Sequence, residues 1–135
     1  MKHWYVYHSQ KTMGHSYESM AESAVYSTKQ QPKLCIGDII WVVEGNNNQP
    51  TGFSIADCFK HSRADYPSPY GAYSKYKLKV EGKSLLKNKN IGLEKHVPWF
   101  DQLHKGYITK QKFFVQIDNQ KEVVKGLIDV SGVAI

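Results

Sequence analysis

The chain has 135 residues, the usual size of one domain, and this length excludes multidomain enzymes. Hydrophobic residues make up 41% of it and charged residues 22%, which is typical of a globular protein and not of a disordered or fibrous one. Lysine and arginine outnumber aspartate and glutamate by 18 to 12, and aromatic residues reach 13%. A net charge of +6 together with many rings suits a protein that binds nucleotide backbones and unstacked bases.

The first predicted element is a strand over His3–His8, because its residues are mostly aromatic or β-branched. Gln10–His15 is polar and is predicted to form a loop. Apolar residues then recur at helical spacing over Tyr17–Tyr26, which predicts a short helix with Ser16 as its N-cap and an end before Pro32.

The central part of the chain predicts a pair of antiparallel strands. Ile39–Val43 is a continuous apolar run, which is typical of a strand buried on both faces. Gly45–Pro50 breaks this run, and Gly52–Phe59 resumes it with alternating polarity. The segment Tyr66–Gly71 that follows contains two prolines and is predicted to be irregular.

Tyr73–Val80 predicts a half-exposed strand, because its apolar side chains alternate with lysines that we expect on the solvent face. Ser84–Lys95 is rich in lysine and asparagine and is predicted to be a loop. Pro98 suits the first position of a helix of one or two turns. Phe113–Ile117 then predicts a strand and Glu122–Ile128 a terminal helix. Strands spaced this closely leave no room for repeated βαβ units, so we expect one α+β domain over residues 1–135 with a mixed or curled sheet.

Several classes of protein are not indicated by the sequence. No apolar run is long enough to cross a bilayer and the first residues lack a signal peptide's apolar stretch, so we expect a cytoplasmic protein without a membrane partner. Cys35 and Cys58 lie in apolar runs without a neighbouring cysteine, which predicts two buried, reduced thiols and no structural zinc or disulfide.

Motifs for catalysis, metal or a cofactor are also missing. None of the six histidines lies in a zinc-binding pattern, and no nucleophile elbow or phosphate-binding loop occurs. Glu81-Gly82-Lys83 has the Glu-x-Lys spacing of many nucleases, but Gly82 favours a turn and not the strand that such a site needs. Asp57 is the only acid inside a predicted strand. We therefore predict no catalytic residue, no metal and no cofactor.

Aromatic rings are the remaining candidate site. Tyr26, Trp41 and Trp99 border predicted loops, where rings can form walls around a flat ligand. Stacking on such a ring stabilises a bound base by about 1–3 kcal/mol, which helps to extract a nucleotide whose pairing a lesion or modification has weakened. Rings on buried strands are usually core residues, and this alternative stays open for Trp4 and Trp41.

Three segments together resemble the PUA superfamily, and within it the EVE and YTH branch. They are the opening strand that ends at His8-Ser9, the segment Ala24–Thr28, and the strand Gly37–Val43 that returns through Gly52–Ala56. In YTH domains a strand ending in Lys-Ser-Tyr leads through a helix to Trp-Ala-Ser-Thr, whose tryptophan is one wall of a cage for N6-methyladenine. This chain has His8-Ser9-Gln10 and Tyr26-Ser27-Thr28 in the matching places, so the methyladenine specificity does not carry over.

The resemblance covers roughly residues 2–60 and implies a curled mixed β-barrel with flanking short helices, a pocket for one flipped base and a basic rim. The expected function is that of a nucleic-acid-binding module that captures a single modified base of DNA or RNA, on which a separately encoded effector protein would act. The candidate base-binding residues are His8, Ser9, Tyr26, Trp41 and Trp99. The candidate backbone-binding residues are Lys75, Lys77, Lys79, Lys87 and Lys89, for which a solvated strand face and loop is the alternative.

Two other functions stay open at this point. One is a small nucleotide- or RNA-modifying enzyme of the related ASCH type that uses Asp57. The other is an accessory domain whose aromatic surface binds another protein.

Overall fold

A computed structural model of the chain describes residues 1–14, 16–18, 22–27, 34–46, 48, 51–65, 78–87, 91–93, 98–110 and 114–135. The helices are α1 (Gln10–Met13), α2 (Pro98–Lys110) and α3 (Lys121–Ser131). The strands are β1 (His3–Ser9), β2 (Ala24–Ser27), β3 (Ile39–Gly45), β4 (Phe53–Asp65), β5 (Leu78–Ser84), β6 (Ile91–Leu93) and β7 (Phe114–Gln116).

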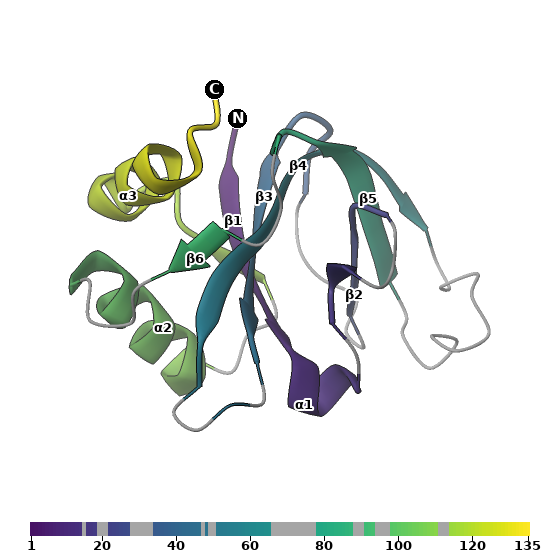
Figure 1. Ribbon diagram of the computed structural model, residues 1–135. Helices are drawn as coiled ribbons and strands as arrows, with labels where there is room; N and C mark the ends of the chain where they lie inside the picture. The colour runs from purple at the N-terminus through teal and green to yellow at the C-terminus, as the bar shows by residue number, and fades with distance from the viewer. Residues whose placement is uncertain are drawn as a thin grey trace.

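The described strands form one mixed sheet that curls into a half-barrel (Figure 1). Its order is β2-β5-β4-β3-β1-β7, and β6 pairs with the start of β4. β1 and β3 are parallel, and the other pairs are antiparallel. β4 pairs with β3 along its first part and with β5 along its last part, and the pairing register shifts once in each ladder. Such bulges bend a strand and increase its twist, which allows the sheet to curl at β4.

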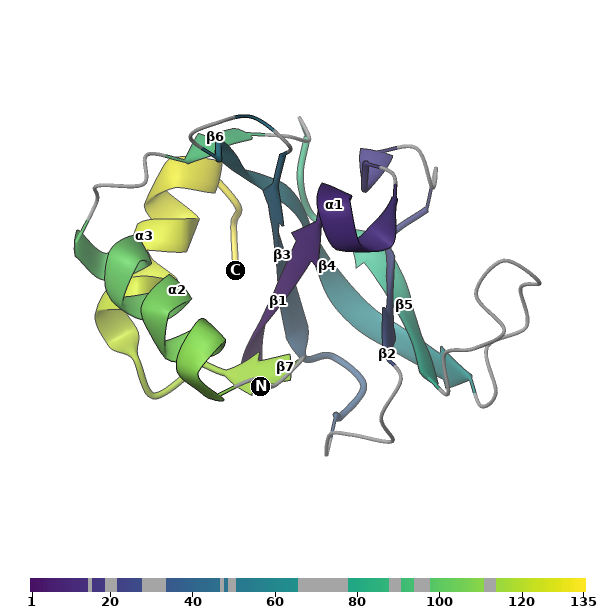
Figure 2. The same cartoon turned by 90° about the horizontal axis from the view of Figure 1, so that it is seen from below.

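Both faces of β3 are covered, which explains its continuous apolar sequence. On one face Trp41 packs in a core with Phe100 of α2 and Leu127 of α3. On the other face Val42 packs with Val80 of β5 inside the curl of the sheet. Figure 2 shows this division, with α2 and α3 on one side of β1 and β3 and with α1 and β2 on the other.

Several sequence predictions are confirmed. The structure is a curled mixed sheet with helices, as the α+β prediction states, and β1 begins at His3. β3 and β4 form the predicted antiparallel pair. The helix predicted at Pro98 does begin there, although it continues to Lys110 and is longer than two turns. The terminal helix and the strand before it are also present.

The helix predicted over Tyr17–Tyr26 is wrong. Ala24–Ser27 is a strand that pairs with Leu78–Glu81 of β5, and α1 lies earlier, in the segment predicted to be a loop. The Tyr17 ring is buried in the curl, and its hydroxyl accepts a hydrogen bond from the backbone N–H of Ala24 over 3.1 Å. Pairing between strands far apart in the sequence has overridden the local helical pattern.

The solvent-exposed position predicted for Lys79 is also wrong. Lys79 is 1% exposed, although it lies on the opposite face of β5 from buried Val80, as the alternation predicts. Gly82 lies within β5 and not in a turn. A Cβ atom on Gly82 would come within 1.9 Å of the carbonyl oxygen of Lys60, so glycine allows β4 to approach closely beside its bulge.

β6 lies inside the segment predicted to be a loop. Cys58 is buried as predicted, but Cys35 is exposed. The predictions for residues 66–71 and 73–77 fall outside the described residues. Within the part of the chain that the structure describes, the helices are too short and polar to span a membrane.

Candidate functional site

A pocket of about 290 Å³ lies at the carboxyl ends of β1 and β3, at the lower end of these strands in Figure 1. Because β1 and β3 are parallel, their last residues reach the same edge of the sheet, where α1 follows β1 and where β4 begins. The pocket is lined by Gln10, Ser16, Glu18, Glu44, Asn46, Gly52, Phe53 and Ser54. The lining therefore combines carboxylates, amides and hydroxyls, whereas the ring of Phe53 packs against Tyr7, Phe100 and His104.

Glu44 is the most buried polar group of this lining, at 5% exposed. Its Oε2 accepts a hydrogen bond from the backbone N–H of Tyr17 over 2.6 Å, and His8 Nε2 lies 3.7 Å from the same oxygen. The register of the parallel pair makes His8 and Glu44 direct partners, which explains why the two side chains meet. Both contacts use Oε2, and Oε1 has no hydrogen-bond partner among the described residues.

The end of β3 is shaped by a close approach to β1. A Cβ atom on Gly45 would lie 1.8 Å from the hydroxyl oxygen of Tyr7, so a side chain at this position would displace the Tyr7 ring. Burial and the nearby charge of Glu44 raise the pKa of Tyr7 above its ordinary value. The Tyr7 hydroxyl is therefore neutral over the physiological pH range.

Asn46 closes the loop between β3 and β4 on the other side of the pocket. Its Oδ1 accepts hydrogen bonds from the backbone N–H groups of Asn48 and Gly52, both over 2.9 Å. The backbone N–H of Asn46 also donates to the carbonyl of Gly52 over 3.0 Å. These bonds fix the side chain, and its Nδ2 amide has no partner in the described segments.

The candidate base-binding rings do not line this pocket. Trp41 is fully buried, and its Nε1 donates to Nδ1 of His3 over 3.0 Å. Tyr26 is 2% exposed and donates to Glu22 over 2.8 Å. Trp99 is half-buried between α2 and α3, where a Cβ atom on Gly126 would lie 2.3 Å from its ring. The structure therefore does not bring these three rings together, and it supports the core alternative for Trp41.

His8 and Ser9 lie much closer to the observed pocket. Both are at the end of β1, directly before the lining residue Gln10, and His8 contacts Glu44. His8 also packs edge to face on Tyr17, with ring centroids 5.7 Å apart. The structure thus brings this chain segment next to the pocket, although neither His8 nor Ser9 belongs to the lining.

The candidate backbone-binding lysines divide into three groups. Lys79 is buried and contacts two carboxylates, so it is not a phosphate contact. Lys87 is exposed. Lys75, Lys77 and Lys89 lie outside the described residues. Near the pocket, the exposed Lys11 of α1 directly follows Gln10.

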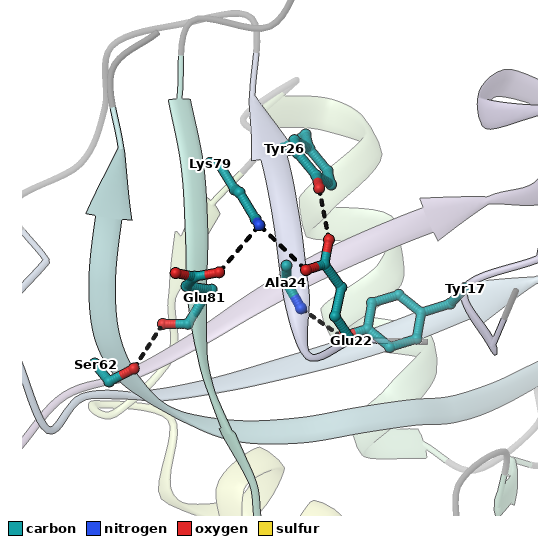
Figure 3. A network of polar contacts seen from close by, with 7 residues as sticks. All are labelled: Tyr17, Glu22, Ala24, Tyr26, Ser62, Lys79 and Glu81. Carbon is teal, nitrogen blue, oxygen red and sulfur yellow. Dashed lines mark hydrogen bonds and ion pairs between the residues drawn. The ribbon is translucent and has the colours of Figure 1, made fainter. Parts of the chain in front are cut away.

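Lys79 and Tyr26, predicted as two separate ligand-binding groups, instead belong to one ionic cluster (Figure 3). Lys79 Nζ lies 3.1 Å from Glu22 Oε2 and 3.0 Å from Glu81 Oε2. Tyr26 donates to the other oxygen of Glu22, and Lys79 lies 6.0 Å from the centre of its ring. This cluster joins β2 to β5 and neutralises the buried lysine.

Asp57 is an interior hydrogen-bond acceptor and not an exposed catalytic acid. It is fully buried, and its oxygens accept hydrogen bonds from the hydroxyls of Tyr17, Ser23 and Ser84 over 2.8, 2.6 and 2.6 Å. The proposed catalytic use of Asp57 therefore lacks access to a substrate. Among the described residues, no three His, Cys, Asp or Glu side chains are placed to hold a metal ion.

The lining residues Glu44, Asn46 and Phe53 were not predicted from the sequence. A signal was present, because Glu44 ends an apolar run just as His8 ends the apolar part of β1. Two polar residues at the ends of neighbouring parallel strands indicate a site at that edge. The parallel pairing of β1 and β3 was needed to use this signal.

Comparisons of the chain with family models, with curated proteins and with solved structures found no match. The resemblance to the PUA superfamily therefore rests on the motifs within residues 2–60.

Proposed function

We propose that this chain is a nucleic-acid-binding module of PUA-like type, which captures a single, modified base of DNA or RNA in the pocket beside Glu44. The observation that carries the proposal is the composition of the lining. Glu44 and Asn46 offer a fixed acceptor and a fixed donor for a base edge. Hydrogen bonds to the base edge are one of the means by which proteins hold a flipped base.

The size of the pocket supports a single base. Its volume of about 290 Å³ is at the lower end of small-ligand pockets, which span about 300–1,000 Å³. A base or nucleoside fits such a space better than a dinucleotide does. The two carboxylates of the lining, Glu18 and Glu44, also repel phosphate, so the backbone stays outside the pocket.

The backbone has cationic contacts available at the rim. Lys11 is exposed directly beside the lining residue Gln10, and the net charge of the chain is +6. Lys60 lies in the middle of β4, where it is the strand partner of Lys83 in β5 and of Ile39 at the start of β3, away from the pocket. We therefore assign the phosphate contacts near the pocket to Lys11 in preference to these two.

The test compares labelled duplexes with a fully paired centre, a central mismatch, and a methylated or hydroxymethylated central base, each at two salt concentrations. We expect weaker pairing to give tighter binding, because extraction of the base then costs less free energy. Ser54→Phe fills the pocket beside Glu44, its direct strand partner, and should remove this preference. Ser62→Phe on the exposed part of the same strand is the matched control. Equal affinity for all duplexes, unchanged by Ser54→Phe, would overturn the proposal.

A further inference from the structure

Among the described residues, Oε1 of Glu44 has no hydrogen-bond partner, and Glu44 lines the pocket. Glu44 is 5% exposed, and Tyr17 and His8 contact only its Oε2. A carboxylate oxygen forms strong, charge-assisted hydrogen bonds with N–H donors. Oε1 therefore favours a ligand that brings an N–H group to it.

The neighbouring polar group restricts the ligand further. Both hydrogen bonds to Asn46 end on its Oδ1, so this side chain can offer the ligand only the N–H groups of Nδ2. Glu44 supplies an anionic acceptor and Asn46 a neutral donor, and both line the same pocket. The matching base edge has an N–H donor beside an acceptor.

We propose that the pocket selects a base that carries an exocyclic amino group, such as cytosine or adenine, over uracil and thymine, and this inference rests on the proposed base capture. On the pairing edge of cytosine and of adenine, the exocyclic amino group offers an N–H donor, and the neighbouring ring nitrogen is an acceptor. In uracil and thymine the edge N–H lies between two carbonyl oxygens, which the charge of Glu44 repels. A carboxylate is the group that reads a cytosine amino group in other base contacts.

The test uses short single strands made of abasic residues with one central base, so that the backbone is the same in every probe. The central base is cytosine, uracil or N4,N4-dimethylcytosine, and binding is measured by fluorescence anisotropy. We expect the cytosine strand to bind roughly tenfold tighter than the uracil strand, because uracil brings no amino group to Oε1 of Glu44. The dimethylated base has no N–H and should bind no better than uracil.

Glu44→Gln tests the same contact from the side of the protein. The carbonyl of the glutamine can accept from the backbone N–H of Tyr17, which directs its amide N–H groups to the pocket. The preference for cytosine should then disappear or change to uracil. Glu122→Gln removes the same charge from the exposed first turn of α3 and should keep the cytosine preference.

The outcomes separate the two proposals. If cytosine and uracil bind equally and both exceed a fully abasic strand, base capture stands and amino-group selection is overturned. If no base exceeds the fully abasic strand, base capture itself fails. Should Glu44→Gln not fold, the dimethylcytosine strand on the unaltered protein still decides the question.

Discussion

The Tyr17 hydroxyl donates a 2.8 Å hydrogen bond to Oδ2 of Asp57, in a part of the interior where both side chains are at most 1% exposed. The backbone N–H of the same tyrosine holds Glu44 at the pocket. Burial and the neighbouring Asp57 raise the pKa of Tyr17 well above its ordinary value, so the hydroxyl keeps its proton. Tyr17 therefore links the buried carboxylate of β4 to the pocket edge of β3.

Tyr17→Phe should destabilise the fold without removing the contact to Glu44. It deprives Asp57 of a donor and the backbone N–H of Ala24 of its acceptor, at an expected cost of about 1–3 kcal/mol in the free energy of unfolding. Urea denaturation measures this loss. Ser62→Ala, which removes an exposed hydroxyl, should stay within about 0.5 kcal/mol of the unaltered protein. A Tyr17→Phe variant as stable as Ser62→Ala would contradict the assignment.

The ionic cluster of β2 and β5 predicts an asymmetric response to substitution. Lys79 has a side chain that is 2% exposed, whereas those of Glu22 and Glu81 keep 32% and 27%. Glu22→Gln combined with Glu81→Gln removes two carboxylates from a buried ammonium and should cost about 3–5 kcal/mol. Lys79→Met leaves carboxylates that water can reach, so its cost should be smaller. Thermal or urea unfolding of both variants checks the order, and the reverse order would show that the lysine is hydrated.

The sequence predicted the central hairpin because its signals are local. Ile39–Val43 is apolar at every position, and the structure covers β3 on both faces. The helix over Tyr17–Tyr26 failed for the opposite reason. The hydrogen bond between Tyr17 and Asp57 and the pairing of β2 with β5 join residues 40 or more positions apart, and helical spacing contains no information about either contact.

The error at Lys79 shows a second limit of pattern reasoning. Alternation correctly placed Lys79 and Val80 on opposite faces of β5, but alternation does not tell whether the second face meets water. Here that face carries Tyr26 and Glu22, so the lysine is buried against its own chain. The pocket was missed in a similar way, because the meeting of His8 and Glu44 depends on the parallel register of β1 and β3.

Phosphate binding at the rim predicts a specific change in salt dependence. Lys11→Gln should reduce the slope of log affinity against log salt by about one if this lysine neutralises one phosphate. Lys125→Gln, at a lysine that is also exposed but lies on α3, should leave the slope unchanged. Binding isotherms of one oligonucleotide over a series of salt concentrations measure both slopes. Equal slopes for the two variants would place the backbone elsewhere on the surface.

Two buried histidines predict a loss of stability on mild acidification. Burial lowers the pKa of His3 and of His61 below the ordinary value, although nearby acceptors and carboxylates act in the other direction. The unfolded chain then binds protons at a higher pH than the folded one, so stability falls as the pH drops below about 6.5. His61→Gln should reduce this loss. One histidine contributes at most about 1.4 kcal/mol of lost stability for each pH unit. The free energy of unfolding at pH 7.5 and 5.5 provides the test, and an unchanged pH dependence would show that His61 titrates normally.

Two glycines in neighbouring parts of the sheet should respond in opposite ways to a methyl group. At Gly82 an added Cβ would lie 1.9 Å from the carbonyl oxygen of Lys60, a backbone atom that cannot move without separating β4 from β5. At Gly92 in β6 nothing lies within 4 Å of the added atom. Gly82→Ala should therefore destabilise the protein by about 1–3 kcal/mol or more, and Gly92→Ala should be neutral or stabilising by up to about 1 kcal/mol. Urea denaturation gives the free energy of unfolding of both variants, so it compares an added methyl group at a crowded position with one at a position that has free space. Equal effects would mean that the close approach of the strands at the β4 bulge does not occur in solution.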